Sequence, residues 1–237
     1  MISDIIKRNL LPLVDFIFGF ADLNGLIDKK FDGFRYGISI GKRLDDRIID
    51  KIIDGPTIEY YNYYNQVNKE LAELTRRIVS DFIASGIESM AIEPTVSHAE
   101  EKYKDYLKTL TVDISHKLVA TRAGLGWIGK TDLFISERFG PRLRLVSILL
   151  KRDPGIAAVP FDESKCGGCS ICVEKCPAKA ATGKLWNINL HREEFFDAQK
   201  CRKKCAELAM QKLQVDERIC GMCVAVCPLG KKKNLAN

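Results

Sequence analysis

The stretch Cys166-Gly-Gly-Cys169-Ser-Ile-Cys172-Val-Glu-Lys-Cys176-Pro177 decides the fold of the C-terminal third of this chain. A shorter stretch with related spacing follows it, Cys220-Gly-Met-Cys223-Val-Ala-Val-Cys227-Pro228. Cysteines separated by two residues within a turn direct their thiolates toward one metal centre, and the proline after the last cysteine turns the chain away. The two stretches therefore predict thiolate coordination of metal.

The spacing is typical of ferredoxins with two [4Fe–4S] clusters, in which the fourth cysteine of a run binds the other cluster. One cluster is then expected on Cys166, Cys169, Cys172 and Cys227. Three corners of the other are expected on Cys176, Cys220 and Cys223, and its fourth ligand must be Cys201 or Cys205. A disulfide framework explains neither the spacing nor the prolines, and zinc sites fit this crossed arrangement less well.

The composition changes sharply along the chain, because all nine cysteines of the 237 residues follow position 165. We expect one domain at 1–155 and an iron–sulfur domain at 156–237. The apolar run at 10–23 is interrupted by Pro12, Asp15 and Asp22, so no membrane segment is expected. Nine thiols without a recognisable signal peptide indicate a reducing cytoplasm.

The formal net charge is +6, from 37 basic and 31 acidic residues that are largely interleaved. Much of the excess lies at 200–204 and 231–233. Such runs are usually solvated faces or tails. A basic rim that docks an acidic electron donor is at least as well supported as nucleic-acid binding.

Hydrophobic periodicity predicts an α/β or α+β domain before the cysteines. Strands are expected at 14–20, 34–40, 90–92, 133–135 and 143–150, the last of them central in the sheet. Helices are expected from Thr57 to about Gly86, at 114–123 and, after the first cysteine run, at 193–213.

A glycine segment, Gly124-x-Gly126-x-x-Gly129, formally matches the dinucleotide fingerprint. A helix precedes it, whereas the fingerprint needs a strand before and a helix after, and no acidic residue ends a second strand downstream. We therefore expect no NAD or FAD here. The segment fits a turn in which glycines let the backbone approach a large flat or phosphorylated cofactor. The alternative is a helix-to-strand turn that binds nothing.

The stretch Ala123-Gly-Leu-Gly-Trp-Ile-Gly-Lys130, then Arg138-Phe-Gly140 and the first cysteine run, resembles epoxyqueuosine reductase, a corrinoid-dependent iron–sulfur reductase related to the reductive dehalogenases. The resemblance implies an α+β protein: a nitroreductase-like α/β sandwich followed by a bacterial-ferredoxin-like module with two [4Fe–4S] clusters. It implies a cobalamin, for which the expected contacts are Gly124, Gly126, Trp127, Gly129 and Lys130. It also suggests Cys201 as the missing cluster ligand, after a pair like Phe196-Asp197, with Cys205 as a spare thiol.

Two departures from the family bear on activity. We expect this protein to lack the additional C-terminal helical-repeat region with which the family holds tRNA, so tRNA is expected to be a doubtful partner. The family's proton-donating aspartate lies farther upstream of the glycine segment than Asp113. His116, whose type titrates in a suitable range, and Asp113 one helical turn before it are the candidate acids, and surface or capping roles are the alternative for both.

Three functions follow. The first is a corrinoid-dependent reductase of a small molecule or modified nucleoside, supplied by a low-potential donor such as ferredoxin or flavodoxin. The second is a ferredoxin-like electron-transfer protein, or a reductive activator of a corrinoid protein, with no substrate of its own. The third, a flavin-dependent reductase on a nitroreductase-like scaffold, is the least supported.

Overall fold

The computed structural model describes residues 1–96, 103–155 and 158–231. They form two compact units, each assembled from three segments. The first unit contains Met1–Lys42, Gln66–Leu125 and Arg144–Phe161, and the second contains Arg43–Asn65, Gly126–Leu143 and Asp162–Asn237. The predicted domain boundary falls beside residues 156–157, which lie outside the described residues, and it stays a prediction.

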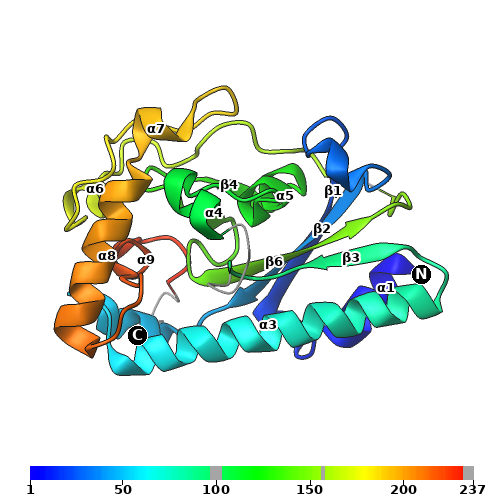
Figure 1. Cartoon of the computed structure of the whole chain (residues 1–237), viewed down its shortest axis with the longest axis horizontal. Helices are drawn as coiled ribbons and strands as arrows, with labels where there is room; N and C mark the ends of the chain where they lie inside the picture. The colour runs from blue at the N-terminus through cyan, green and yellow to red at the C-terminus, as the bar shows by residue number, and fades with distance from the viewer. Residues whose placement is uncertain (97–102, 156–157, 232–237) are drawn as a thin grey trace, which may run out of the picture. The chain divides into compact units, whose positions relative to one another are not determined.

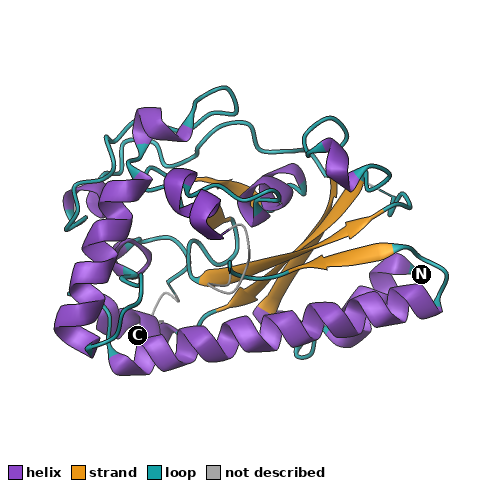
Figure 2. Ribbon diagram, in the orientation of Figure 1, coloured by secondary structure: helices purple, strands orange, loops and turns teal. Residues whose placement is uncertain are grey.

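The first unit contains a four-stranded sheet in the order β1-β2-β6-β3 (Figure 2). Its strands are β1 (Phe16–Asp22), β2 (Tyr36–Arg43), β3 (Ser89–Ile92) and β6 (Leu143–Leu150). β1 pairs antiparallel with β2, and β3 pairs antiparallel with β6. β6 occupies an interior position, as its apolar sequence predicts.

Helices α1 (Ile2–Asn9) and α3 (Ile58–Ala84) lie along one face of this sheet (Figure 1). The Thr57 hydroxyl accepts a hydrogen bond from the Tyr60 amide at 3.1 Å, which caps the start of α3. The helix ends before Gly86, which adopts a φ of +71°. Its buried residues recur every three or four positions, as predicted: Val67, Leu71, Leu74, Ile78 and Phe82.

Helix α5 (His116–Arg122) covers the opposite face of the sheet (Figure 1). Two strand glycines permit a close approach. A Cβ on Gly19 would lie 2.8 Å from the Ala123 carbonyl oxygen, and one on Gly37 would lie 2.8 Å from Val119 Cγ1. The core on this face is Ala21, Leu23, Ile114, Val119, Ala123 and Leu149. The unit is therefore a sheet with helices on both faces, and α4 (Tyr103–Thr109) also belongs to it.

The second unit contains a two-stranded hairpin and short helices. Its elements are β4 (Gly126–Ile128), β5 (Phe134–Ser136), α2 (Asp46–Ile49), α6 (Ile171–Glu174), α7 (Arg192–Phe195), α8 (Ala198–Leu213) and α9 (Met222–Val226). The helix predicted at 193–213 is broken, because the Asp197 side chain accepts from the Lys200 amide at 2.8 Å and starts a new helix, α8. Single turns of 3₁₀-helix occur at Leu13–Asp15, Lys29–Phe31 and Asp50–Ile52.

The predicted mixture of helices and sheet is confirmed. Within the described ranges, no helix is both long and apolar enough to cross a membrane.

Candidate metal centres

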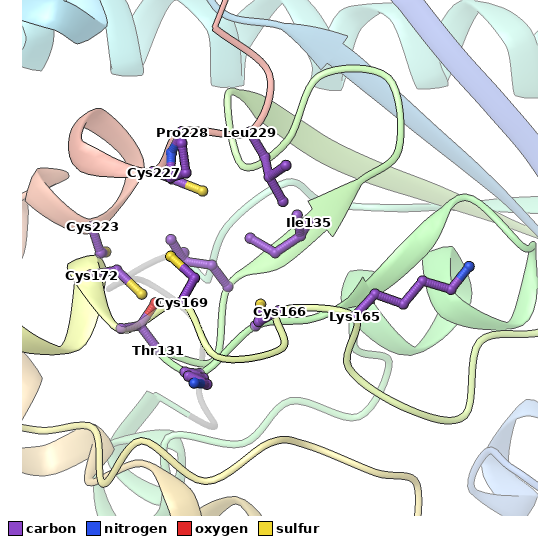
Figure 3. Close-up of a pocket in the computed structure, with 13 residues that line it drawn as sticks. Thr131, Ile135, Lys165, Cys166, Cys169, Cys172, Cys223, Cys227, Pro228 and Leu229 are labelled. Carbon is purple, nitrogen blue, oxygen red and sulfur yellow. The ribbon is translucent and has the colours of Figure 1, made fainter.

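One cavity of about 150 Å³ in the second unit is lined by five cysteines: Cys166, Cys169, Cys172, Cys223 and Cys227 (Figure 3). Cys166 and Cys169 lie in a turn closed by a 3.2 Å hydrogen bond from the Cys169 amide to the Cys166 carbonyl. Cys172 lies in α6, and Cys227 follows α9. The sulfurs of these last four cysteines point toward the same space in Figure 3, whereas the Lys165 amine points away from it. These four, without Cys223, are the thiols expected to hold the first cluster.

The β4–β5 hairpin forms a wall of this cavity. Trp127 Nε1–H donates to Cys166 Sγ at 3.4 Å, and the Thr131 hydroxyl donates to the Cys172 sulfur. Lys130 lines the cavity with only 6% of its surface exposed. Donors and charges beside ligand sulfurs tune the potential of an iron–sulfur cluster. Neither the Trp127 bond nor the role of Thr131 is evident from spacing.

The glycines of segment 124–130 pack against the chain's own backbone. A Cβ on Gly124, at φ +67°, would lie 2.8 Å from the Val159 carbonyl oxygen. A Cβ on Gly126 would lie 2.0 Å from the Ile135 carbonyl oxygen in β5. The segment thus forms the helix-to-strand turn expected as the alternative, and its predicted contact with a corrinoid stays a prediction.

The five cysteines outside the expected first cluster form a second group. Cys201 and Cys205 lie one turn apart on α8, with their sulfurs 3.9 Å apart. The Cys205 sulfur contacts both Cys201 and Cys220, and its hydrogen bond to Cys220 lowers the pKa of Cys220 to about 7. Cys223 lies within electrostatic range of Cys176, Cys201 and Cys220. The second group therefore contains the three predicted ligands and both candidates for the fourth.

Burial controls the protonation of several of these thiols. It raises the pKa of Cys227 to about 11, and it raises the pKa of Cys223 further, with help from neighbouring thiolates. Metal binding must displace these protons, so assembly of a centre is pH-dependent. All nine cysteines are free thiols. Among the described residues, no three His, Cys, Asp or Glu side chains converge as closely as the ligands of a single ion.

A buried arginine holds the helix that carries Cys223, and no pattern in the sequence predicts this role. The Arg142 side chain is 1% exposed, and its guanidinium donates to Asp46 at 2.9 Å and to Asp50 at 2.6 Å. It also donates to the Ala225 carbonyl at 3.2 Å. Because Ala225 stands between Cys223 and Cys227 in the chain, Arg142 positions a thiol of each group.

The two predicted acids lie in the first unit. His116 Nε2–H donates to the Glu93 carbonyl and Nδ1 accepts from the Ser147 hydroxyl, both at 2.9 Å; the carbonyl can only accept, which fixes this tautomer. Burial lowers the pKa of His116 to about 4, so the ring is neutral at pH 7. Asp113 is half exposed and paired with Lys30. Their catalytic roles stay predictions.

Residues 165–230 match a family model described as a 4Fe-4S double cluster binding domain. The match confirms that the chain contains a module for two [4Fe–4S] clusters. It covers the C-terminal part of the chain alone.

The chain is also similar to epoxyqueuosine reductases. It is 29% identical over 177 residues to the enzyme of Lactococcus garvieae, covering 74% of this chain and 43% of the relative. It is 28% identical over 177 residues to that of Cyclobacterium marinum, covering 68% and 50%. The resemblance seen in the sequence is confirmed, and the chain spans half or less of the length of these relatives.

Two kinds of solved structure share the fold. A reductive dehalogenase described with a mechanism for B12-dependent dehalogenation aligns with a TM-score of 0.67 at 15% identity, covering 92% of this chain and 30% of that one. An epoxyqueuosine reductase solved with a modified tRNA stem loop aligns with a TM-score of 0.59 at 18% identity, covering 97% and 64%.

Proposed function

We propose that this protein is an iron–sulfur oxidoreductase similar to epoxyqueuosine reductase, in which two [4Fe–4S] clusters pass electrons to a corrinoid that reduces an organic substrate. Cys166, Cys169, Cys172 and Cys227 hold one cluster. The other is held by Cys176, Cys220, Cys223 and a cysteine of α8. The observation that carries the proposal is the convergence of five thiols from two distant stretches on one cavity.

The ligands form a continuous route for electrons. Cys223 lies in α9 and Cys227 directly follows that helix, so one short segment serves both clusters. Cys223 also lies within electrostatic range of Cys172, a ligand of the other cluster. Cys169 is exposed, and Lys200 and Lys203 on α8 are exposed beside the second group. An acidic low-potential donor such as ferredoxin or flavodoxin fits this basic surface.

The corrinoid is proposed from similarity, since epoxyqueuosine reductases share much of this sequence and a B12-dependent dehalogenase shares the fold. A bound corrinoid supplies a cobalt centre that low-potential clusters can reduce. Gly124 and Gly126 are packed against the chain itself, and Gly129 and Lys130 line the cysteine cavity, so no step of the reaction is assigned to this segment. The helix-covered sheet of the first unit is proposed to be the nitroreductase-like sandwich of such enzymes.

Substrate and location are proposed on the same grounds. A modified nucleoside is the favoured substrate class, because one relative was solved with an epoxyqueuosine-modified tRNA stem loop. A reducing cytoplasm suits nine free thiols.

An electron-transfer protein is the second candidate, and a specific observation favours it. Trp127 donates to Cys166 and Lys130 lines the cluster cavity, and both ring nitrogens of His116 are already hydrogen-bonded. A carrier needs the clusters and a docking surface, and it needs neither a cradle nor an acid.

Anaerobic reconstitution followed by titration with cob(II)alamin separates the two candidates. The reductase is expected to bind about two clusters and to shift the cobalamin to its base-off spectrum. If the protein binds two clusters but the cobalamin spectrum does not change at saturating cobalamin, the electron-transfer protein is the supported function. Flavin that copurifies and bleaches with dithionite would support the third function instead. The Cys169→Ala variant is the control, because it should lose iron from the first cluster only.

A further inference from the structure

The second group contains five thiols, one more than a [4Fe–4S] cluster needs. Cys176, Cys220 and Cys223 occupy the positions that the ferredoxin spacing assigns to three corners. Cys201 and Cys205 remain for the fourth. The spacing leaves the choice open, and the resemblance to relatives favours Cys201.

Both candidate thiols face the same group. Positions separated by four residues lie on one face of a helix, and the Cys201 and Cys205 sulfurs are 3.9 Å apart. Cys201 lies within electrostatic range of Cys223, and Cys205 is hydrogen-bonded to the Cys220 sulfur. Each candidate therefore approaches a different predicted ligand of the same cluster.

The helix that carries the two thiols is firmly placed. The Asp197 carboxylate caps the first turn of α8, and Ala209 and Leu213 are buried at its other end. Cys201 and Cys205 are both only partly exposed. Replacement of one sulfur by the other therefore needs rotation of side chains and no movement of the main chain.

We propose that the fourth corner of the second cluster is exchangeable between Cys201 and Cys205. In the exchange, the iron–Cys201 bond breaks as the iron–Cys205 bond forms, and the Cys205 proton passes to the Cys201 sulfur. No electron is transferred. The unbound thiol stays as a hydrogen-bond donor beside the cluster, so loss of one cysteine is compensated by the other. This rests on the proposed two-cluster function.

Three variants test the exchange: Cys201→Ala, Cys205→Ala and the double variant, each reconstituted anaerobically. Both single variants should keep about eight irons per chain, and the double variant should fall to about four or give a three-iron EPR signal. The EPR signal of the first cluster is the internal control for folding. Iron loss in only one single variant would overturn the proposal, as would full iron in the double variant. Wild-type protein with about four irons would instead refute the two-cluster function.

Alkylation of the wild-type holoprotein gives a test without substitution. With eight of nine cysteines bound, anaerobic iodoacetamide should label one thiol per chain. Cleavage after Glu194 and Glu207 releases both candidates in one peptide, 195–207, whose fragment spectra locate the label. Exchange predicts label divided between Cys201 and Cys205, never both in one molecule. Label on a single position throughout would overturn it.

Discussion

Replacement of Arg142 by methionine should destabilise the second unit and weaken cluster binding together. Arg142 is 1% exposed and donates to two carboxylates and to the Ala225 carbonyl. Methionine retains much of the apolar stem, so little packing is lost, while the three acceptors lose their donor. Removing one partner of a buried ion pair costs about 3–5 kcal/mol.

Three features place the expected cost at the lower end of that range. Asp50 is 59% exposed and can be hydrated, and Asp46 keeps a second partner, Arg43, at 2.7 Å. The buried Arg142 Nε has no hydrogen-bond partner, so its removal also relieves a penalty. We expect a loss of about 3 kcal/mol, which lowers the melting temperature of the anaerobic holoprotein by about 6–12 °C.

The assay is thermal unfolding under nitrogen, followed by circular dichroism and by iron release. Arg47→Met is the matched control, since Arg47 pairs with Asp45 while 88% exposed, and such a solvated pair should contribute little to stability. Iron should leave Arg142→Met faster than wild type, because Ala225 lies between Cys223 and Cys227. Equal melting temperatures for the two variants would refute the role assigned to the buried guanidinium.

Two further substitutions test the contacts of single side chains. Trp127→Phe removes the N–H donor to Cys166, so one cluster should shift to a more negative potential in an EPR-monitored redox titration. Trp186→Phe is the control, because the hydrogen bond that Trp186 accepts from the Ser164 amide is made by its main-chain carbonyl and survives the change, so both potentials should stay unchanged. His116→Gln tests the buried ring. The pKa of His116 is about 4 in the folded protein and about 6.5 in the unfolded chain. As pH falls from 6.5 to 4, the unfolded state takes up the proton first, so wild type should lose up to about 3 kcal/mol of stability. The variant should lack that part of the loss, and identical pH profiles for the two proteins would contradict the neutral buried histidine.

The sequence predicted the elements whose pattern is long. Helix α3 repeats its apolar positions over 27 residues, and β6 is an apolar run of 8 residues, so both were expected near their observed bounds. Of the two three-residue hairpin strands, β5 was expected at 133–135, whereas β4 was missed because so short a strand allows no period to be read. The break between α7 and α8 depends on one capping side chain, Asp197, inside a stretch that otherwise suits a helix.

The candidate site also contains residues that the sequence predicted and residues that it did not. Spacing alone assigned the cysteines of the two runs to clusters, because a cluster imposes a fixed pattern on its ligands, and that assignment stays a prediction. Spacing did not predict Trp127, Thr131 or Arg142 beside them, since a single donor contact leaves no periodic trace in the sequence. Arg142 follows Pro141 in an ordinary loop stretch, and only the fold brings it to Asp46.

The need for a proton donor distinguishes the two candidate functions, because a reductase requires one and an electron-transfer protein does not. A reductase that cleaves a carbon–oxygen bond needs a group that gives up a proton near neutral pH. His116 is neutral there, and its one N–H is bound to a carbonyl, so releasing that proton would leave an anionic ring in a buried site. Asp113 is paired with Lys30, and its carboxylate is half exposed. Neither side chain is prepared to donate as it lies, so a reductase must take its proton from water or from a rearranged Asp113. Turnover that survives Asp113→Asn would assign the proton to water, and turnover abolished by that change alone would assign it to the aspartate.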